Sequence, residues 1–292
     1  SCAGCAETSY ARLITQLFGD RMYIANATGC SSIWGGSAPS TPYTVNKQGH
    51  GPAWSNSLFE DNAEFGMGMQ LAQKAIRTRL KAKVEEVLET TSNDDVKAAA
   101  KEYLDTFMCG STNGTATQKL VAALANENSD AAKEILNDKD MLSKKSQWVF
   151  GGDGWAYDIG FGGVDHVIAS KKDINIFVFN TEVYSNTGGQ ASKATPTGAV
   201  AEFAAAGKEV KQKDIASIAM SYGYVYVAQI AMGADRNQCI KAIAEAEAYP
   251  GPSLIIAYAP CINHSIKTGR AHAQDVEKAA VDSGYWNLFR FN

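Results

Sequence analysis

Two groups of residues in this sequence have the types and spacing that metal chemistry requires. The first group contains four cysteines from three distant segments, namely the C-x-x-C pair of Cys2 and Cys5, then Cys30, then Cys261. Thiolates bind structural Zn²⁺ and iron–sulfur clusters, so these residues predict a metal centre. Their spacing by itself favours zinc. However, the sequence has one C-x-x-C element where a structural zinc site usually pairs two, so both interpretations stay open.

The second group is rich in oxygen ligands and centres on Asp153. The turn Gly152-Asp153-Gly154 lies between a predicted strand and a predicted helix, and 25 residues separate Gly154 from Asn180 and Thr181. That distance leaves room for one helix and one return strand. Mg²⁺ prefers oxygen ligands, such as a carboxylate and a hydroxyl, and commonly bridges them to phosphates. The N-terminal end of a helix also attracts phosphate, so the turn predicts a phosphate-linked magnesium site.

A parallel sheet is expected to bring the two groups together. Apolar β runs alternate with helical segments, which is typical of a parallel sheet covered by helices on both faces. The predicted strands are 22–25, 147–150, 174–179, 225–230 and 253–258. Cys30, Asp153, Thr181 and Cys261 each lie shortly after one of these strands. Ligands bind at the carboxyl ends of such strands, so we predict an α/β fold whose doubly wound, mostly parallel sheet carries both groups on one edge.

The rest of the chain is expected to support this edge. Residues 31–57 are predicted to form an irregular, aromatic-rich loop. Residues 74–145 have helical periodicity and no evident chemistry, which predicts a helical insertion within one domain that spans 1–292. Cys109 and Cys239 are interpreted as buried or half-buried helix residues.

Composition excludes several classes of protein. The chain has 292 residues, with 31 acidic and 27 basic side chains and a net charge of −4, which argues against nucleic acid or an anionic membrane surface as partner. No apolar run approaches the roughly 20 residues that a membrane span needs. The first residues lack the features of a signal peptide, and the initiator methionine is missing. We therefore expect a cytoplasmic protein that is processed or is a piece of a longer polypeptide.

Two longer motifs resemble a known enzyme family. The run from Gly152 to Gly160 (GDGWAYDIG) and the run from Asn180 to Gln190 (NTEVYSNTGGQ) are similar to the thiamine-diphosphate-binding, cluster-carrying part of the pyruvate:ferredoxin oxidoreductases. The resemblance covers nearly the whole chain and is weakest over 74–145. The wider thiamine signature usually ends in two asparagines. Here a threonine hydroxyl replaces the second amide, which keeps a magnesium ligand plausible.

The resemblance implies a role for each matching residue. It implies a fold of the thiamine-diphosphate-binding type, with Asn186 as a catalytic donor to the substrate and Glu7 as a cofactor-contacting acid; a surface helix glutamate is the alternative for Glu7. The implied [4Fe-4S] ligands are Cys2, Cys5, Cys30 and Cys261, and the implied Mg²⁺ ligands are Asp153, Thr181 and the carbonyl of Val183. The implied cofactor-binding residues are Glu7, Gly29, Cys30, Gly152, Asp153, Gly154, Trp155, Thr181, Glu182, Val183, Tyr184, Ser185 and Asn186.

The implied activity is the oxidative decarboxylation of pyruvate to acetyl-CoA and CO₂. The resemblance implies dependence on thiamine diphosphate and coenzyme A, with one-electron transfers through the cluster to ferredoxin or flavodoxin. A pyrimidine-binding domain and further iron–sulfur domains are expected on the same longer chain or on other subunits, in a homodimer. The alternatives are an oxidoreductase for another 2-oxo acid, a non-redox thiamine enzyme with a structural zinc, and an electron-transfer or metal-binding module without catalysis.

Overall fold

The computed structural model describes residues 2–37, 41–264 and 266–292. The chain divides into two compact units. One unit combines the residues up to Met67 with residues 147–292, and the other is Gly68–Ser146.

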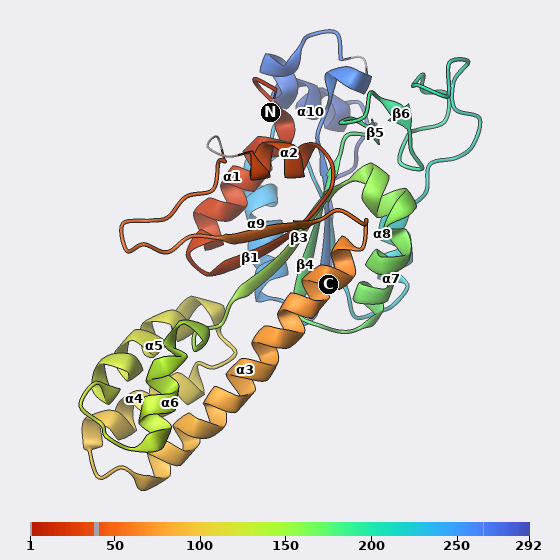
Figure 1. The fold of residues 1–292 in the computed structure, drawn as a ribbon. Coiled ribbons are helices and arrows are strands. Elements are labelled where there is room, and N and C mark those ends of the chain that lie inside the picture. Colours follow the sequence, from red (N-terminus) through yellow and green to blue (C-terminus); the bar gives the residue numbers. More distant parts are fainter. Residues whose placement is uncertain (1, 38–40, 265) are drawn as a thin grey trace. The chain divides into compact units, whose positions relative to one another are not determined.

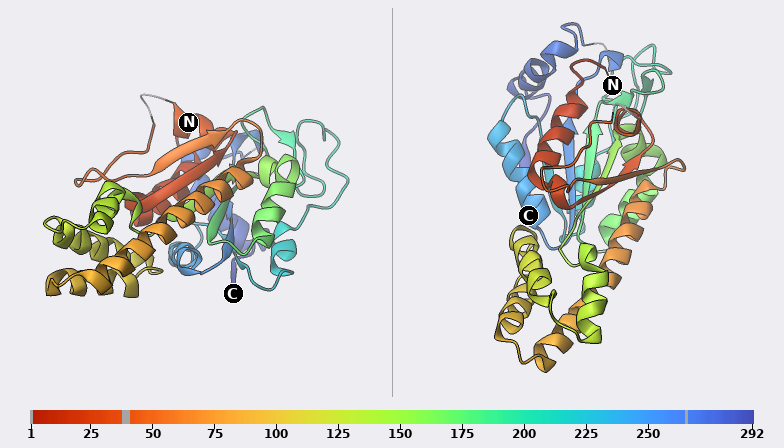
Figure 2. Two further views of the ribbon diagram at one scale, coloured as in Figure 1. Left: turned by 60° about the horizontal axis from the view of Figure 1, so that its bottom comes forward. Right: turned by 60° about the vertical axis from the view of Figure 1, so that its left-hand side comes forward.

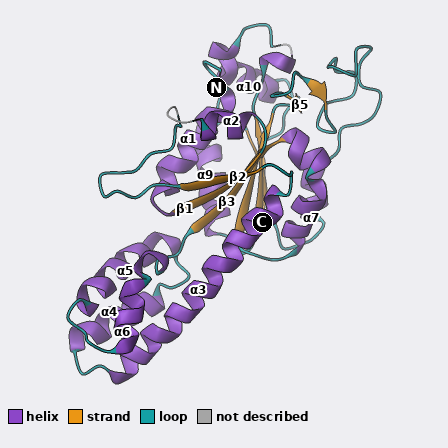
Figure 3. Cartoon of the chain, in the orientation of Figure 1, coloured by secondary structure: helices purple, strands orange, loops and turns teal. Residues whose placement is uncertain are grey.

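The first unit is built on a sheet, whose strands are orange in Figure 3. Its seven strands have the order β2-β1-β3-β4-β8-β7-β9. The pairings β1–β2, β3–β4, β4–β8 and β7–β8 are parallel, whereas β9 runs antiparallel to β7. The strand bounds are β1 Met22–Ala27, β2 Ala53–Ser57, β3 Ser146–Gly152, β4 Ile174–Asn180, β7 Tyr226–Ile230, β8 Pro252–Tyr258 and β9 Phe289–Phe291. The sheet is therefore mostly parallel, as the alternating pattern predicts.

Helices cover both faces of this sheet (Figures 1 and 2). On one side lie α1 (Ala6–Phe18) and α9 (Arg236–Ala248), and on the other lie α7 (Phe161–Ala169) and α8 (Ile215–Met220). Every residue of β4 is buried, because successive side chains of a strand point to opposite faces and both faces are covered. Phe177 and Phe179 of β4 pack in the core beneath α1 and α9, where Tyr10 lies with its ring centroid 5.8 Å from that of Phe177.

Shorter elements occupy the connections of this unit. Residues 31–57 are not an irregular loop throughout, because α2 begins at Cys30 and β2 adds an edge strand. The helix predicted after the turn Gly152-Asp153-Gly154 is instead a π-helical turn followed by α7. The bounds are η1 Gly19–Arg21, α2 Cys30–Gly36, η3 Gly154–Ile159, β5 Val183–Tyr184, β6 Gln190–Ala191, η4 Ile262–His264, η5 Arg270–His272 and α10 Ala273–Asp282.

The second unit is helical and has its own apolar core. Asn93 and Ser129 cap two of its helices, since their side chains accept hydrogen bonds from free N–H groups of the first turn. The elements are α3 Asn62–Thr90, which begins in the first unit, α4 Asp94–Asp105, α5 Gly110–Leu124, α6 Asp130–Asn137 and η2 Lys139–Met141. The interpretation of Cys109 is wrong, because this residue is exposed and precedes α5, whereas Cys239 is buried within α9.

None of the helices in the described parts of the chain has the length and apolar character needed to cross a membrane.

Candidate active site at the carboxyl edge of the sheet

The candidate functional residues lie at the carboxyl ends of four neighbouring strands. Cys30 follows β1, Asp153 follows β3, Thr181 follows β4 and Cys261 follows β8, and these strands are adjacent in the order β1-β3-β4-β8. The last residues of β4 and β8 pair with each other, so the two strands end at the same level. The topology thus brings segments together that are far apart in the sequence.

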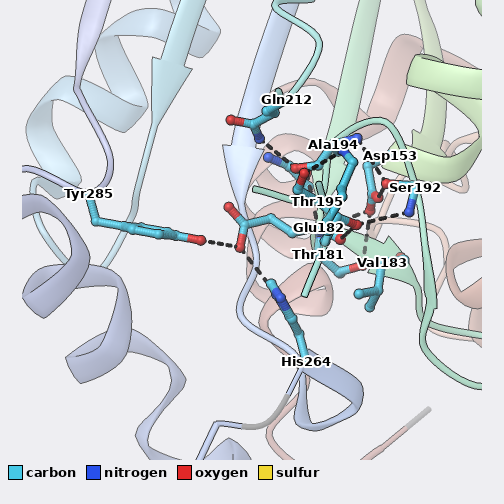
Figure 4. A network of polar contacts seen from close by, with 12 residues as sticks. Asp153, Thr181, Glu182, Val183, Ser192, Ala194, Thr195, Gln212, His264 and Tyr285 are labelled. Carbon is cyan, nitrogen blue, oxygen red and sulfur yellow. Dashed lines mark hydrogen bonds and ion pairs between the residues drawn. The ribbon is translucent and has the colours of Figure 1, made fainter. Parts of the chain in front are cut away.

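Asp153 is the centre of a buried oxygen cluster (Figure 4). Its Oδ1 accepts a hydrogen bond of 3.1 Å from the Thr181 backbone N–H, and its Oδ2 accepts one of 2.7 Å from the Ser192 hydroxyl. The Thr181 hydroxyl lies 3.0 Å from Asp153 Oδ1 and 2.9 Å from the carbonyl oxygen of Val183. One hydroxyl proton cannot satisfy both acceptors. Three oxygen atoms therefore lie close together with too few protons for hydrogen bonds between them. Such a set of oxygen ligands fits a hard cation such as Mg²⁺.

Burial sets the charge state of Asp153. Its side chain is 1% exposed, and burial raises its pKa to about 7, against the opposing hydrogen bonds from Ser192 and Thr181. A bound cation would offset this desolvation and favour the carboxylate. Ser192 belongs to this cluster although no motif in the sequence marks it.

Polar atoms beside this cluster lack partners within the described residues. Trp155 Nε1 and Asn180 Nδ2 are both buried and neither donates a hydrogen bond there. Such orphaned donors are uncommon in folded proteins and fit a polar ligand that occupies the site. Gly154 lies under the Tyr184 ring, where an added Cβ would come within 2.4 Å of a ring carbon. Glycine is therefore required where the backbone after Asp153 approaches the loop after β4.

The C-x-x-C pair forms a tight turn at the same edge. The Cys5 N–H donates a 3.1 Å hydrogen bond to the Cys2 carbonyl, and Gly4 between them has a left-handed φ of +73°. A Cβ at Gly4 would lie 2.9 Å from the carbonyl oxygen of Arg270. Glycine is thus needed both for the turn and for its close approach to the segment after Cys261.

Cys30 connects the cysteine group to the loop after β4. Its Sγ lies 3.3 Å from Ser185 Oγ and 3.9 Å from Asn186 Oδ1. Ser185 and Asn186 follow Val183, which belongs to the oxygen cluster, so a short segment spans the two groups. Gly29 precedes Cys30 in the connection from β1 to α2, and Gly152 is the last residue of β3.

The thiols influence one another electrostatically. Burial, followed by the charge of Glu7, raises the pKa of Cys5 and of Cys30 to about 12. Cys2 and Cys261 raise the pKa of Cys30 further. Such thiols need a positive partner to become thiolates, and iron or zinc supplies one. Within the described residues, no three His, Cys, Asp or Glu side chains are close enough together to hold a single metal ion.

Glu7 lies between the thiols and the oxygen cluster and is not a surface glutamate. Its side chain is 3% exposed, and its Oε2 accepts a 2.9 Å hydrogen bond from Trp34 Nε1. Burial raises the pKa of Glu7 to about 7; the Trp34 hydrogen bond opposes this, and the charge of Asp153 adds to it. The alternative of a solvent-exposed helix residue is therefore wrong.

A second network surrounds Glu182 in the same loop. Its Oε2 accepts a 2.7 Å hydrogen bond from the Tyr285 hydroxyl and lies 3.2 Å from His264 Nδ1 (Figure 4). No motif in the sequence marks His264 or Tyr285 as a site residue. The position of His264, three residues after Cys261, was the one signal that could have indicated its place.

Comparison with known proteins gives this site a family context. The family described as "Thiamine pyrophosphate enzyme, C-terminal TPP binding domain" matches residues 131–257, which include the oxygen cluster. The chain is 57% identical to a pyruvate-flavodoxin oxidoreductase of Klebsiella pneumoniae and 58% identical to a pyruvate:ferredoxin oxidoreductase of Moorella thermoacetica. Both alignments cover 100% of this chain and 25% of the relative. The predicted resemblance to the pyruvate:ferredoxin oxidoreductases is confirmed.

A solved structure confirms the fold class. A 2-oxoglutarate:ferredoxin oxidoreductase from Magnetococcus marinus is similar with a TM-score of 0.53 and 15% identity, over 91% of this chain and 66% of that one. The chain spans a quarter of the length of the pyruvate:ferredoxin and pyruvate-flavodoxin oxidoreductases that it matches.

Proposed function

We propose that this chain supplies the magnesium–diphosphate site and a neighbouring [4Fe-4S] site of a pyruvate:ferredoxin oxidoreductase. In this proposal the whole enzyme carries out the thiamine-diphosphate- and CoA-dependent oxidative decarboxylation of pyruvate to acetyl-CoA and CO₂. Electrons pass singly to ferredoxin or flavodoxin. The same proposal includes a pyrimidine-binding domain and further iron–sulfur domains. It also includes a homodimer and a cytoplasmic location.

One observation carries the proposal. The Sγ atom of Cys30 lies 3.3 Å from Ser185 Oγ, in the loop after β4 that also carries Thr181 and Val183 of the oxygen cluster. A structural metal has no need to lie beside a cofactor, whereas an electron acceptor does. The proximity of the thiols to the diphosphate site therefore favours a redox role over a structural zinc or a plain metal-binding module.

The residues of the oxygen cluster have distinct proposed tasks. Asp153, Thr181 and the Val183 carbonyl would hold Mg²⁺, while the unpartnered donors of Trp155 and Asn180 fit a polar cofactor. When bound, thiamine diphosphate supplies the electron sink that decarboxylation requires. Gly152, Gly154 and Trp155 would form the part of the site that binds the diphosphate.

The thiol and loop residues have complementary tasks. Cys2, Cys5, Cys30 and Cys261 would hold the cluster. Asn186, beside Cys30, would donate a hydrogen bond to the substrate. Glu7 would contact the cofactor from the thiol side, together with Gly29. Glu182, Tyr184 and Ser185 form the adjoining loop.

The substrate class follows from the relatives rather than from this site. The relatives at 57% and 58% identity are named for pyruvate, whereas the 2-oxoglutarate enzyme is similar at 15% identity and informs on the fold alone. We therefore favour pyruvate over another 2-oxo acid.

An anaerobic preparation of the full-length protein tests this function. We expect iron and sulfide together with a broad visible absorption band that dithionite bleaches. In the Asp153→Ala variant we expect loss of Mg²⁺-dependent thiamine diphosphate binding, measured by calorimetry, while the visible band persists. In the Cys30→Ala variant the band should be lost or altered.

Each alternative has its own outcome in this experiment. A colourless protein with bound zinc would overturn the redox part of the proposal. Undiminished thiamine diphosphate binding in Asp153→Ala would show that the diphosphate site lies elsewhere. Asp214→Ala is a matched control, because Asp214 is an acidic residue of the same unit whose carboxylate accepts hydrogen bonds from Ser217 and thereby caps α8.

A further inference from the structure

We propose that His264 is a positioning residue: through Glu182, it holds the segment of Cys261 in a fixed place relative to the segment of Thr181 and Val183. This inference rests on the proposed function, because it concerns the separation of the two proposed sites. It assigns a task to His264 that neither metal binding nor cofactor binding requires.

Glu182 is held in a strained backbone conformation between two proposed magnesium ligands. Its φ of +65° lies in the left-handed region, which is unfavourable for a non-glycine residue. Its backbone N–H donates to Asn180 Oδ1, and its carbonyl accepts from the Thr195 hydroxyl. This conformation directs the carboxylate away from Asp153 and towards His264 (Figure 4). Strain that persists at such a point indicates that the direction of this side chain matters.

His264 binds the other segment. It ends the 3-10 turn η4, and its backbone N–H donates a 3.0 Å hydrogen bond to the carbonyl of Cys261. Its Nδ1 lies 3.2 Å from Glu182 Oε2, where 2% of the Glu182 side chain and 14% of the His264 side chain are exposed. The preceding Asn263 donates its side-chain N–H to the Ser185 carbonyl. Two contacts thus fasten the segment after β8 to the loop after β4.

This fastening has a functional consequence because the two segments carry ligands of different groups. Cys261 belongs to the thiols, whereas Glu182 is covalently flanked by Thr181 and Val183 of the oxygen cluster. The rate of electron transfer falls as the separation of donor and acceptor grows. Contacts that fix the separation of the two sites would therefore influence electron transfer between them.

Tyr285 provides a matched control. Its hydroxyl donates a 2.7 Å hydrogen bond to the same Oε2 of Glu182, but it belongs to the segment after α10, which carries no proposed ligand. The Tyr285→Phe variant removes one hydrogen bond from the carboxylate and leaves the link to Cys261 in place. The His264→Asn variant keeps a side-chain N–H near the position of Nδ1, and His264→Ala removes it.

The experiment compares these three variants in the full-length, anaerobically purified protein. The first measurement is the electron paramagnetic resonance spectrum of the dithionite-reduced protein, which reports on the surroundings of the cluster without substrate. The second is the rate at which pyruvate bleaches the visible band. We expect an altered spectrum and a rate lowered on the order of tenfold in His264→Ala, with substantial recovery in His264→Asn and little change in Tyr285→Phe.

The outcomes separate this inference from the proposed function. A wild-type protein without a reducible cluster signal overturns the proposed function, and the inference with it. A wild-type signal that His264→Ala leaves unchanged, together with an unchanged rate, overturns the positioning role alone. An equal effect of Tyr285→Phe and His264→Ala would also overturn it, because general loosening of Glu182 would then explain both. If His264→Ala loses its iron, recovery of iron in His264→Asn supports the inference, and failure to recover contradicts it.

Discussion

Burial determines the protonation of three carboxyl groups in the sheet unit. It raises the pKa of Glu7, Asp153 and Glu277 to about 7 in each case. Glu7 and Asp153 lie at the candidate site, where a bound cation or cofactor would change their surroundings. Glu277 is 1% exposed, lies on α10 and accepts a 2.6 Å hydrogen bond from the Gly233 N–H. Glu277 lies outside the candidate site, so its raised pKa shows the effect of burial without that of a bound cation or cofactor.

Glu277→Gln should change how stability depends on pH. Because the folded-state pKa of Glu277 exceeds the ordinary value of 4.5, the native state binds more protons between these values, and stability falls as pH rises from about 4.5 through 7. Above pH 7 the charged carboxylate would destabilise the fold by up to about 3 kcal/mol. We expect the variant to unfold at a higher temperature than wild type at pH 8, and at a similar temperature at pH 5.

Thermal unfolding of the intact protein at both pH values checks this prediction. Asp282→Asn is the control, because Asp282 lies at the end of the same helix and pairs with Lys278 at the surface. An effect of Glu277→Gln that is the same at pH 5 and pH 8 would exclude titration of Glu277 as its cause.

Among the elements, the helical unit depends on one buried arginine. Arg77 of α3 donates from Nε to the Leu142 carbonyl at 3.0 Å and from Nη2 to the Phe107 carbonyl at 2.8 Å and to Asn113 Oδ1 at 3.2 Å. Its guanidinium carbon lies 4.0 Å from the centroid of the Phe107 ring. One side chain thus donates hydrogen bonds to acceptors at or near the ends of several helices.

We expect Arg77→Met to destabilise the helical unit by at least about 2 kcal/mol, because buried acceptors lose their donors. Hydrogen exchange of residues 68–146 in the intact protein measures this loss. Arg79→Ala is the control on the same helix, since Arg79 pairs with Glu134 and Asp138 at the surface and should have little effect. Faster exchange in the sheet unit, or equal effects of both variants, would contradict the prediction.

The elements that could be predicted from the sequence are those whose pattern is local and strong. The apolar run of β4 and the periodicity of α6 indicate their elements directly. The strand β2 could not be predicted, because its half-buried residues follow an aromatic-rich segment and its pairing with β1 is a tertiary contact. The π-helical turn after Asp153 has no sequence signal of its own; such turns are frequent at functional sites.

The candidate site could be predicted to a similar extent. The site residues that follow the strands could be predicted from the positions of those strands, because parallel strands end at a common edge of the sheet. Ser192 and Tyr285 reach the site from irregular segments, and their contacts depend on how loops fold over the sheet. The burial of Glu7 depends on α2, an element that the sequence did not indicate.

At the scale of the whole molecule, the helical unit is an insertion whose two ends meet. A Cβ at Gly66 would lie 2.5 Å from Val149 Cγ2 and 3.8 Å from Gln147 Nε2, so the chain leaves and re-enters the sheet unit at neighbouring points. A short linker can therefore replace the residues between them without stretching the sheet unit.

A variant of the full-length protein can be made in which a short Gly/Ser linker replaces residues 68–145. We expect this variant to retain iron and to bind thiamine diphosphate, because the described site residues lie outside this range. Iron analysis and calorimetry against the unshortened protein measure both properties. Loss of thiamine diphosphate binding in a shortened protein that retains its iron would show that the helical unit contributes to the diphosphate site.

The sheet order also decides when the four thiols can meet during synthesis. Cys2 and Cys5 precede Cys261 by more than 250 residues, and Cys261 follows β8, which lies between β4 and β7 in the sheet although it is translated after both. At roughly 5–20 residues translated per second, this delay is on the order of tens of seconds. The four thiols can therefore come together only once β8 has joined the sheet, so any metal group that needs all four of them would be inserted after that step of folding.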